Sequence, residues 1–167
     1  PIMMRLQSDL VSHCLAALDH TLDSQVIEWD SRPSVGVVLA ADGYPGSYAK
    51  GETIGFDNVS DNNDLKFFHA GTSMNGDNVV SSGGRVLCAT ALGNSVTEAQ
   101  SRAYDLIDQI DWPSAYYRKD IAYRAIAREA EEIAGDFVHA GVAEAAHRLH
   151  VDGPFVEHMA DEGDRVY

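Results

Sequence analysis

A short apolar segment that leads into a capped helix is the feature that most constrains the fold of this chain. Residues 85–92 read RVLCATAL, and NSVTEAQSRAYDLIDQI follows after a single glycine. Ser95 and Glu98 form an S-x-x-E capping box, in which each side chain satisfies a free backbone N–H at the helix start. The apolar residues after the cap recur on one helical face, at Val96, Ala99, Ala103, Leu106, Ile107 and Ile110. The pattern predicts a strand followed by an amphipathic helix.

Further strand segments precede this pair. Residues 34–41 (SVGVVLAA) form a short apolar run that is typical of a strand buried on both faces. Residues 66–72 are followed by Asn75-Gly76, a strong tight-turn signal, and Gly83-Gly84 marks a second turn. The simplest arrangement is a three-stranded meander of residues 66–72, a short strand around Val79-Val80, and residues 85–92.

Apolar residues at helical spacing predict another helix over residues 4–18. Its apolar face consists of Leu6, Leu10, Val11, Cys14, Leu15 and Leu18. Helices on either side of the strand segments predict an α+β fold, with a small, mainly antiparallel sheet and flanking helices. The two cysteines, Cys14 and Cys88, each lie inside an apolar run, which favours buried free thiols over a disulfide.

The charge balance excludes some classes of partner. Acidic side chains outnumber basic ones 26 to 12, which gives a formal net charge of −14. Nucleic-acid binding depends on clustered Lys and Arg, so the composition argues against nucleic acids and against an anionic membrane surface. A small anion can still bind where a local pocket opposes the global sign. Free thiols, with neither a signal peptide nor an apolar stretch of spanning length in the sequence, predict a cytoplasmic location.

The last part of the chain differs in composition. Residues 129–167 carry ten acidic and two basic side chains, and their helix formers predict a helical acidic tail. Its four histidines are His139, His147, His150 and His158. Zinc sites need three or four well-placed ligands, so a solvated helix face is favoured over a metal site.

Several positions are candidates for binding an anion. Gly83-Gly84 and Arg85 offer backbone N–H groups and a guanidinium to a phosphate, but a strand follows where a phosphate loop has a helix, so a hairpin turn is favoured. His69, in FFHAGT, is favoured as a core residue over a catalyst. Arg5 either holds an anion at a helix start or is a surface arginine. The basic cluster in residues 118–128 is interpreted as pairing with the protein's own carboxylates.

The order of five segments carries more information than any one of them. The segments are PIMMRLQSDLVSHCLAALDHTLD, WDSRPSVGVVLAADGYPGSYAKGETI, FHAGT, GGRVLCATALGNSVTEAQSRAYDLIDQIDW and YRKDIAYRAIARE. Together they resemble the C-terminal part of the phosphoribosylamine–glycine ligases, a family of ATP-grasp enzymes in de novo purine biosynthesis. The similarity extends from Pro1 to about Glu129.

The resemblance implies a function that the residue patterns alone do not specify. Enzymes of this family join glycine to 5-phosphoribosylamine and convert ATP to ADP and phosphate. The resemblance assigns the ATP and magnesium sites to an ATP-grasp portion upstream of the position matching Pro1, so this chain alone is expected to be inactive. The alternative is a stand-alone, non-catalytic binding domain derived from such a ligase.

The resemblance also implies a division of the chain. Residues 1–31 match the last helix and linker of the ATP-grasp domain, residues 32–129 match the C-terminal domain that closes over the active site, and residues 130–167 have no family counterpart. Arg5 is the main candidate for contacting the phosphoribosyl group. Weaker substrate-binding candidates on the closing domain are His69, Gly71, Thr72 and Arg85, and no catalytic or metal-binding residue is assigned.

Two departures from the family pattern bear on local geometry. The family commonly has Gly-Gly-Tyr-Pro-Gly where this chain has Asp42 before Gly43, and Asp-Ile-Gly where it has Asp120-Ile121-Ala122. A positive φ at Asp42 or Ala122 would be tolerated less well than at glycine.

Overall fold

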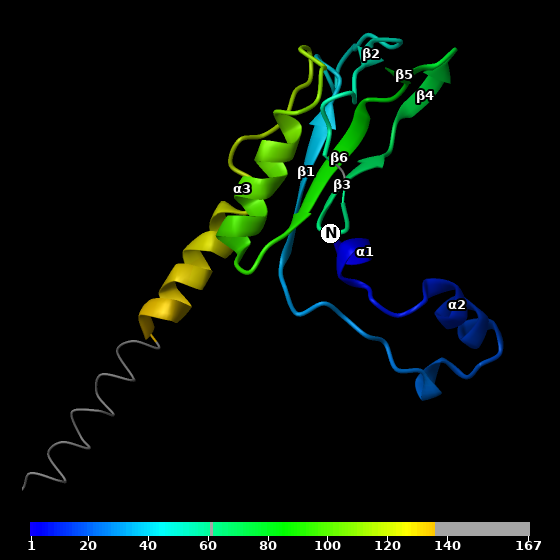
Figure 1. Cartoon of the computed structure of the whole chain (residues 1–167), viewed down its shortest axis with the longest axis vertical. Coiled ribbons are helices and arrows are strands. Elements are labelled where there is room, and N and C mark those ends of the chain that lie inside the picture. The colour runs from blue at the N-terminus through cyan, green and yellow to red at the C-terminus, as the bar shows by residue number, and fades with distance from the viewer. Residues whose placement is uncertain (61, 136–167) are drawn as a thin grey trace, which may run out of the picture. The chain divides into compact units, whose positions relative to one another are not determined.

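The computed structural model describes residues 1–60 and 62–135 of the chain. They belong to two compact units, Pro1–Ala127 and Arg128–Tyr167. In chain order, the elements of the first unit are α1 (Ile2–Arg5), α2 (Leu10–Leu18), η1 (Leu22–Ser24), β1 (Ser34–Ala40), β2 (Thr53–Ile54), β3 (Leu65–His69), β4 (Thr72–Asn75), β5 (Asn78–Ser81), β6 (Arg85–Leu92) and α3 (Val96–Ile107) (Figure 1).

An antiparallel sheet in the strand order β1–β6–β3 forms the centre of the first unit. Helix α3 packs against β1 and β6 (Figure 1). Its apolar face and the facing strand residues form the core, which includes Val37, Leu39, Ala103 and Leu106. The predicted α+β class with antiparallel strands and flanking helices is therefore confirmed.

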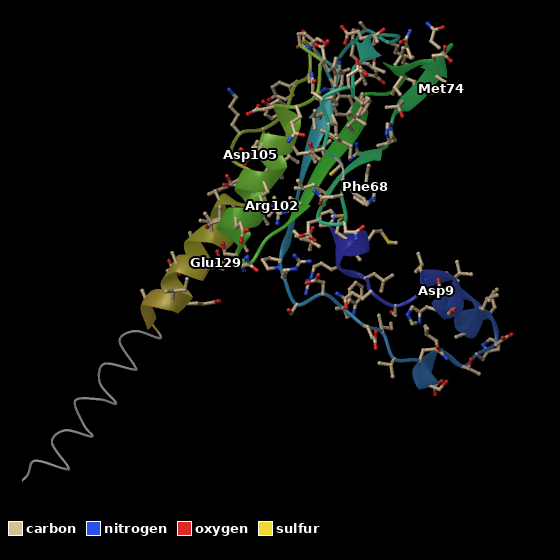
Figure 2. The ribbon with its side chains drawn as sticks, viewed as in Figure 1. Asp9, Phe68, Met74, Arg102, Asp105 and Glu129 are labelled. Atoms are coloured by element: carbon tan, nitrogen blue, oxygen red, sulfur yellow. The ribbon has the colours of Figure 1, made fainter. Side chains whose placement is uncertain are left out.

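Burial along β1 alternates, so the prediction of a strand buried on both faces is wrong. Val35, Val37 and Leu39 are buried, whereas Val38 is 44% exposed. The physical reason is that α3 covers only one face of the sheet. Phe68 of β3 projects on the side away from α3 (Figure 2), in register with Cys88 of β6.

Helix α3 begins as its capping box predicts. Ser95 Oγ accepts the backbone N–H of Glu98 at 3.0 Å, and the Glu98 carboxylate accepts the backbone N–H of Asn94 at 2.7 Å. The buried residues of the helix are Ala99, Ala103, Leu106 and Ile107. The spacing of the apolar residues therefore identified the core-facing stripe correctly.

The predicted three-stranded meander is wrong. β4 and β5 form a hairpin whose turn contains Gly76 at φ 61°, and β5 also pairs with β2 in a second sheet, in the order β2–β5–β4. β6 belongs to the other sheet, and β3 is its neighbour there. Gly83-Gly84 is therefore a corner between two sheets. The turn signals located the chain reversals but could not specify which strands pair, because pairing is non-local.

The single helix predicted over residues 4–18 is interrupted. Asp9 caps a new helix, α2, by accepting the N–H groups of Val11 at 3.0 Å and Ser12 at 3.3 Å. The buried residues of α2 are His13 and Ala16. Its large apolar side chains are exposed instead, by 44% at Leu10, 63% at Val11, 56% at Leu15 and 76% at Leu18.

Both cysteines are free thiols, as the sequence predicts, but neither is buried. Cys14 lies on α2 and is exposed. Cys88 is partly exposed because it faces the side of the sheet that α3 leaves uncovered.

The acidic tail coincides largely with the second unit. Its described residues, 128–135, are helical. The tail histidines, His139, His147, His150 and His158, and the rest of the predicted tail helix lie outside the described residues.

Candidate functional site

A cleft of about 510 Å³ lies beside Arg5. Its lining residues are Pro1, Ile2, Arg5, Trp29, Pro33 and Ser34. Arg5 is the only charged side chain among them, and it is partly buried. The indole of Trp29 is about half exposed, with a relative accessibility of 48%. A concave site with a cationic group and an aromatic surface suits a small anionic ligand.

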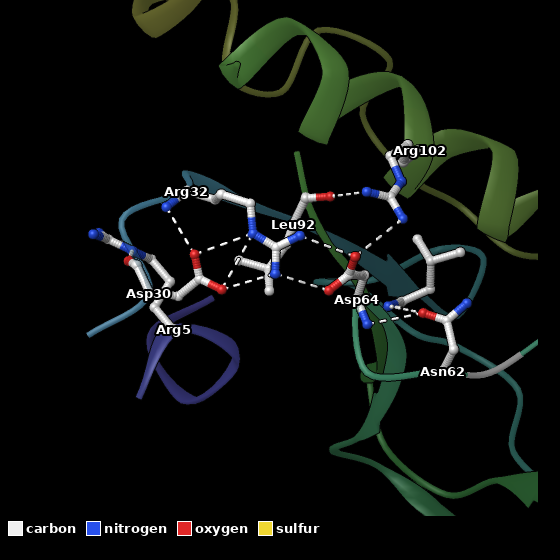
Figure 3. Close-up of polar contacts among 8 residues, drawn as sticks. Arg5, Asp30, Arg32, Asn62, Asp64, Leu92 and Arg102 are labelled. Atoms are coloured by element: carbon white, nitrogen blue, oxygen red, sulfur yellow. Dashed lines mark hydrogen bonds and ion pairs between the residues drawn. The ribbon is translucent and has the colours of Figure 1, made fainter. Parts of the chain in front are cut away.

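The linker before β1 holds Arg5 in place (Figure 3). Arg5 Nε donates to the carbonyl oxygen of Asp30 at 3.0 Å, and the Asp30 N–H donates back to the Arg5 carbonyl at 2.6 Å. Next to these contacts, Leu6 forms an antiparallel bridge with Trp29. Within the part of the chain that the structure describes, the two Nη atoms of Arg5 make no hydrogen bond or ion pair. Those donors are therefore available to a ligand.

Arg32 lies between two carboxylates next to this site (Figure 3). Its Nη2 donates to Asp30 Oδ2 at 2.8 Å and to Asp64 Oδ1 at 3.0 Å. Hydrogen bonds from the Arg32 side chain lower the pKa of Asp30 to about 2 and also lower the pKa of Asp64. The hydrogen bond to Asp30, followed by that to Asp64, raises the pKa of Arg32. Arg102 extends the network, because its Nη2 lies 3.7 Å from Asp64 Oδ2 and its Nη1 donates to the Leu92 carbonyl at 2.6 Å.

His69 ends β3 and is exposed, so its interpretation as a core histidine is wrong. Its Nδ1 lies 3.0 Å from Thr72 Oγ1, and its ring lies 5.5 Å from that of Phe56. The hydrogen bond fixes the orientation of an imidazole that remains accessible to solvent.

The glycine corner brings Gly71 and Arg85 together. A Cβ on Gly71 would lie only 2.6 Å from the Arg85 carbonyl oxygen, so glycine is required for this close approach. The Gly71 carbonyl accepts the N–H groups of Ser82 at 2.8 Å and Gly83 at 3.1 Å. Because the Gly83 N–H, one of the two glycine donors considered for a phosphate, already has an acceptor, the turn interpretation is favoured over a phosphate cradle. The Arg85 side chain is exposed and lines a second cleft of about 470 Å³.

The structure groups four of the five candidate residues and separates the fifth. His69, Gly71, Thr72 and Arg85 gather where β3 and β4 meet the start of β6. Arg5 lies beside the other end of β1, because Ser34 lines its cleft whereas Ala40 pairs with Arg85. The two groups of candidate residues therefore lie at separate places on this chain.

The basic cluster in residues 118–128 pairs at least in part with the protein's own acids. Arg118 Nε and Nη2 donate to the Asp120 carboxylate at 2.8 Å and 2.7 Å. In residues 1–60 and 62–135, no three histidine, cysteine or acidic side chains are grouped so that they can hold a metal ion. No helix in the same residues has the length and apolarity needed to span a bilayer.

Comparison with known proteins decides the family. The sequence profile described as "Phosphoribosylglycinamide synthetase, C domain" matches residues 34–124, which is more than half of the chain. The chain belongs to this family. The matched region begins at β1 and extends beyond α3, so this C domain includes the complete β1–β6–β3 sheet.

Relatives named phosphoribosylamine–glycine ligase are similar over most of this chain. The protein of Vibrio cholerae is 62% identical over 129 residues, which are 77% of this chain and 30% of the relative. The protein of Pseudomonas syringae pv. tomato is 56% identical over 132 residues, covering 79% of this chain and 31% of the relative. The chain thus spans less than a third of the length of these ligases.

A solved structure shows the same fold. The crystal structure of phosphoribosylamine–glycine ligase from Thermotoga maritima matches with a TM-score of 0.52 and 30% identity. The match covers 65% of this chain and 27% of that one. The fold of the matched part of this chain is therefore shared with a known ligase.

Sequence reasoning missed the network around Arg32. The sequence did offer a local signal for part of this network. An acidic and a basic residue, Asp30 and Arg32, lie close together between Trp29 and Pro33, so a carboxylate–guanidinium pair could have been expected there. Asp64 is 32 residues away from Arg32 and lies before β3, so only the folded sheet brings it to the guanidinium.

Proposed function

We propose that this chain is the C-terminal part of a ligase that joins glycine to 5-phosphoribosylamine in de novo purine biosynthesis. The complete enzyme would convert ATP to ADP and phosphate and act in the cytoplasm. The observation that carries this proposal is the C-domain match, together with identity above 50% to ligases named for this reaction.

ATP and magnesium would be bound by the remaining part of the ligase. When bound, magnesium and ATP supply the phosphoryl-transfer chemistry that activates the glycine carboxylate. The role of this chain is then to bind and position the phosphoribosyl substrate.

Arg5 is the residue that we assign to the phosphate of 5-phosphoribosylamine. A planar guanidinium can give two parallel hydrogen bonds to a phosphate, and partial burial strengthens the charge interaction. Because Nε is already held by Asp30, fewer rotatable bonds remain to be ordered when a ligand binds the two Nη atoms. In this proposal residues 1–31 belong to the ATP-grasp domain, and residues 32–129 form the domain that closes over the substrate.

His69, Thr72 and Arg85 are proposed as a second group of substrate contacts on the closing domain. The His69–Thr72 hydrogen bond presents an accessible imidazole, and Arg85 adds an exposed cation nearby. Gly71 contributes by allowing the two segments to approach each other.

The apolar face of α2 is expected to contact the rest of the ATP-grasp portion. Four large apolar side chains on a nine-residue helix are exposed in the chain alone: Leu10, Val11, Leu15 and Leu18. A contiguous exposed apolar surface of this kind is characteristic of an interaction site.

A chimaera tests the function. Residues 1–127 of this chain would replace the matching region of the Vibrio cholerae ligase, and ADP formation would be measured with glycine and phosphoribosylamine. We expect turnover that depends on both substrates, whereas the 167-residue chain alone gives none. In the chimaera, Arg5→Lys should raise the KM for phosphoribosylamine, while Arg118→Lys, which lies in a surface ion pair, should not. A folded chimaera without activity would contradict the proposal, and turnover by the chain alone would refute its division of labour.

A further inference from the structure

The guanidinium of Arg32 joins two parts of the chain that the family match separates. The C-domain match begins at Ser34, so Arg32 lies just before it, in the linker that leads into β1. Arg32 binds one carboxylate on each side of that boundary (Figure 3). Asp30 precedes the boundary, whereas Asp64, next to β3, lies inside the C domain.

On the C-domain side, Arg32 is held by the core elements. Its Nη1 and Nη2 donate to the two oxygens of Asp64, both at 3.0 Å, and such a two-pronged pair fixes the plane of the guanidinium. Asp64 Oδ2 also lies 3.7 Å from Nη2 of Arg102, whose Nη1 donates to the Leu92 carbonyl at 2.6 Å. Since Arg102 belongs to α3 and Leu92 ends β6, the helix and the sheet both position this end of the network.

On the other side, Arg32 holds a carboxylate that has little access to water. The Arg32 N–H donates to Asp30 Oδ1 at 2.9 Å, and Nη2 donates to Oδ2 at 2.8 Å. The Asp30 side chain is only 10% exposed, and a carboxylate in such a place is unfavourable without its cation. The Asp30 main chain in turn exchanges two hydrogen bonds with Arg5. The position of Asp30 is therefore passed on to the start of the chain.

The linker has no regular structure that could hold its direction. Residues 25–33 lie between η1 and β1 and contain neither a helix nor a strand. Helix α1 contacts β1 and β6, so the segment before the linker stays attached to the sheet without Arg32. What the Arg32 network adds is a fixed angle, because a planar guanidinium bound to two carboxylates allows little rotation.

We propose that Arg32 is a conformational lock, which fixes the orientation of the segment preceding the C domain by bridging Asp30 and Asp64. The charges alternate in sign from Asp30 through Arg32 and Asp64 to Arg102, so a rotation about the linker would separate opposite charges. In a complete ligase the same lock would set how the C domain faces the upstream part. Its action in this chain does not depend on the ligase reaction.

Two spin labels on the whole chain measure this orientation. One label is attached to Cys14, the exposed thiol of α2. The other is attached to a cysteine introduced by Asp105→Cys, at an exposed position of α3 (Figure 2). Cys88→Ser removes the remaining thiol. We expect a narrow distribution of distances between the two labels, and a broad one in this labelled chain would overturn the lock.

Variants of the network identify the contacts that fix the distance. Arg32→Gln and Asp64→Asn should each broaden or shift the distribution, and the double variant should add nothing further, because both changes remove the same link. Asp64→Glu keeps the carboxylate and should stay closer to the original chain than Asp64→Asn. The control Arg118→Gln breaks a surface ion pair elsewhere and should leave the distribution unchanged.

Hydrogen exchange separates the lock from a general loss of stability. The Asp30 N–H donates to the Arg5 carbonyl, whereas the Ala99 N–H donates to the Ser95 carbonyl in the first turn of α3. Arg32→Gln should speed exchange at Asp30 about tenfold, the loss typical of one charge-assisted hydrogen bond, and leave Ala99 unchanged. An equal acceleration at both amides would mean that Arg32 only stabilises the whole chain, and the lock would be wrong.

An unchanged distance distribution in a folded variant also overturns the lock. The amide spectrum of each variant shows whether it is folded. If Arg32→Gln does not fold, Asp64→Asn replaces it in both measurements, since Asp64 lies outside the linker and removes the same link. The lock is then wrong if Asp64→Asn keeps the narrow distribution, or if Arg118→Gln broadens it equally.

Discussion

Replacing Ala122 with glycine is expected to stabilise this chain. Ala122 has a φ of 67°, in the left-handed region that residues with a Cβ rarely adopt. That conformation costs an L-residue roughly 1–2 kcal/mol, and glycine avoids the cost. Glycine also gives the unfolded chain more freedom, which opposes folding by roughly 0.4–1 kcal/mol. The expected net gain in the free energy of unfolding is therefore on the order of 0.5–1 kcal/mol.

The surrounding hydrogen bonds explain why Ala122 keeps this conformation. Its carbonyl oxygen accepts the N–H groups of Ala125 at 2.9 Å and Ile126 at 3.0 Å, so Ala122 begins the helical segment that follows. A change of its backbone angles would break both bonds, so the unfavourable φ persists in the folded chain.

The control is the same substitution at an ordinary helical position. Ala127 is exposed and helical, so Ala127→Gly should lower stability by about 1 kcal/mol. Urea unfolding followed by far-ultraviolet circular dichroism and by tryptophan fluorescence measures both variants. Hydrogen exchange at the Ala125 and Ile126 amides reports on the helix start directly. A downward shift for Ala122→Gly comparable to that for Ala127→Gly would refute the reasoning.

Two further predictions concern other parts of the first unit. Hydrogen bonds from Ser114 and Trp112 lower the pKa of Glu52, so its contribution to stability is present above the unfolded value of 4.5 and is lost as pH falls through the lower folded pKa. Glu52→Gln should flatten the acid limb of a plot of unfolding free energy against pH, and an unchanged limb would contradict this role. Gly84→Ala should destabilise the chain by about 1–3 kcal/mol, because the added Cβ would overlap the Tyr44 ring. Urea midpoints measure the loss, and a neutral result would show that the ring moves freely.

Local signals in the sequence predicted local structure well. The capping box of α3 and its apolar stripe specify a helix without reference to the rest of the chain. The substitution of the family glycine at Ala122 correctly indicated an unfavourable φ. The same reasoning at Asp42 was not confirmed, because the positive φ in that turn is at Gly43, which is 86°.

Non-local features were not predictable from the same signals. A strand pattern indicates that a segment pairs but carries no information about its neighbour, and so the meander was preferred over β3–β6 pairing. An apolar helical stripe indicates a surface that favours burial, but it does not identify the covering partner, as the exposed face of α2 shows. Asp9 lies inside the apolar pattern of residues 4–18 and was a local signal for the helix break. The helical spacing of the apolar residues on either side obscured that signal.

The sheet geometry ranks the two groups of candidate residues. Ser34 at the Arg5 cleft and Ala40 opposite Arg85 are six residues apart on β1, and a strand rises about 3.3 Å per residue, so the groups lie roughly 20 Å apart. One phosphate cannot contact both arginines across that span.

Arg85 is exposed and makes no hydrogen bond or ion pair within the described residues, so binding through it would order a whole flexible side chain, at a cost of up to about 2 kcal/mol. Arg5 is already held at Nε and therefore loses less entropy on binding, which makes it the stronger candidate for the phosphate, whereas Arg85 can contact a ligand only from the opposite end of the strand.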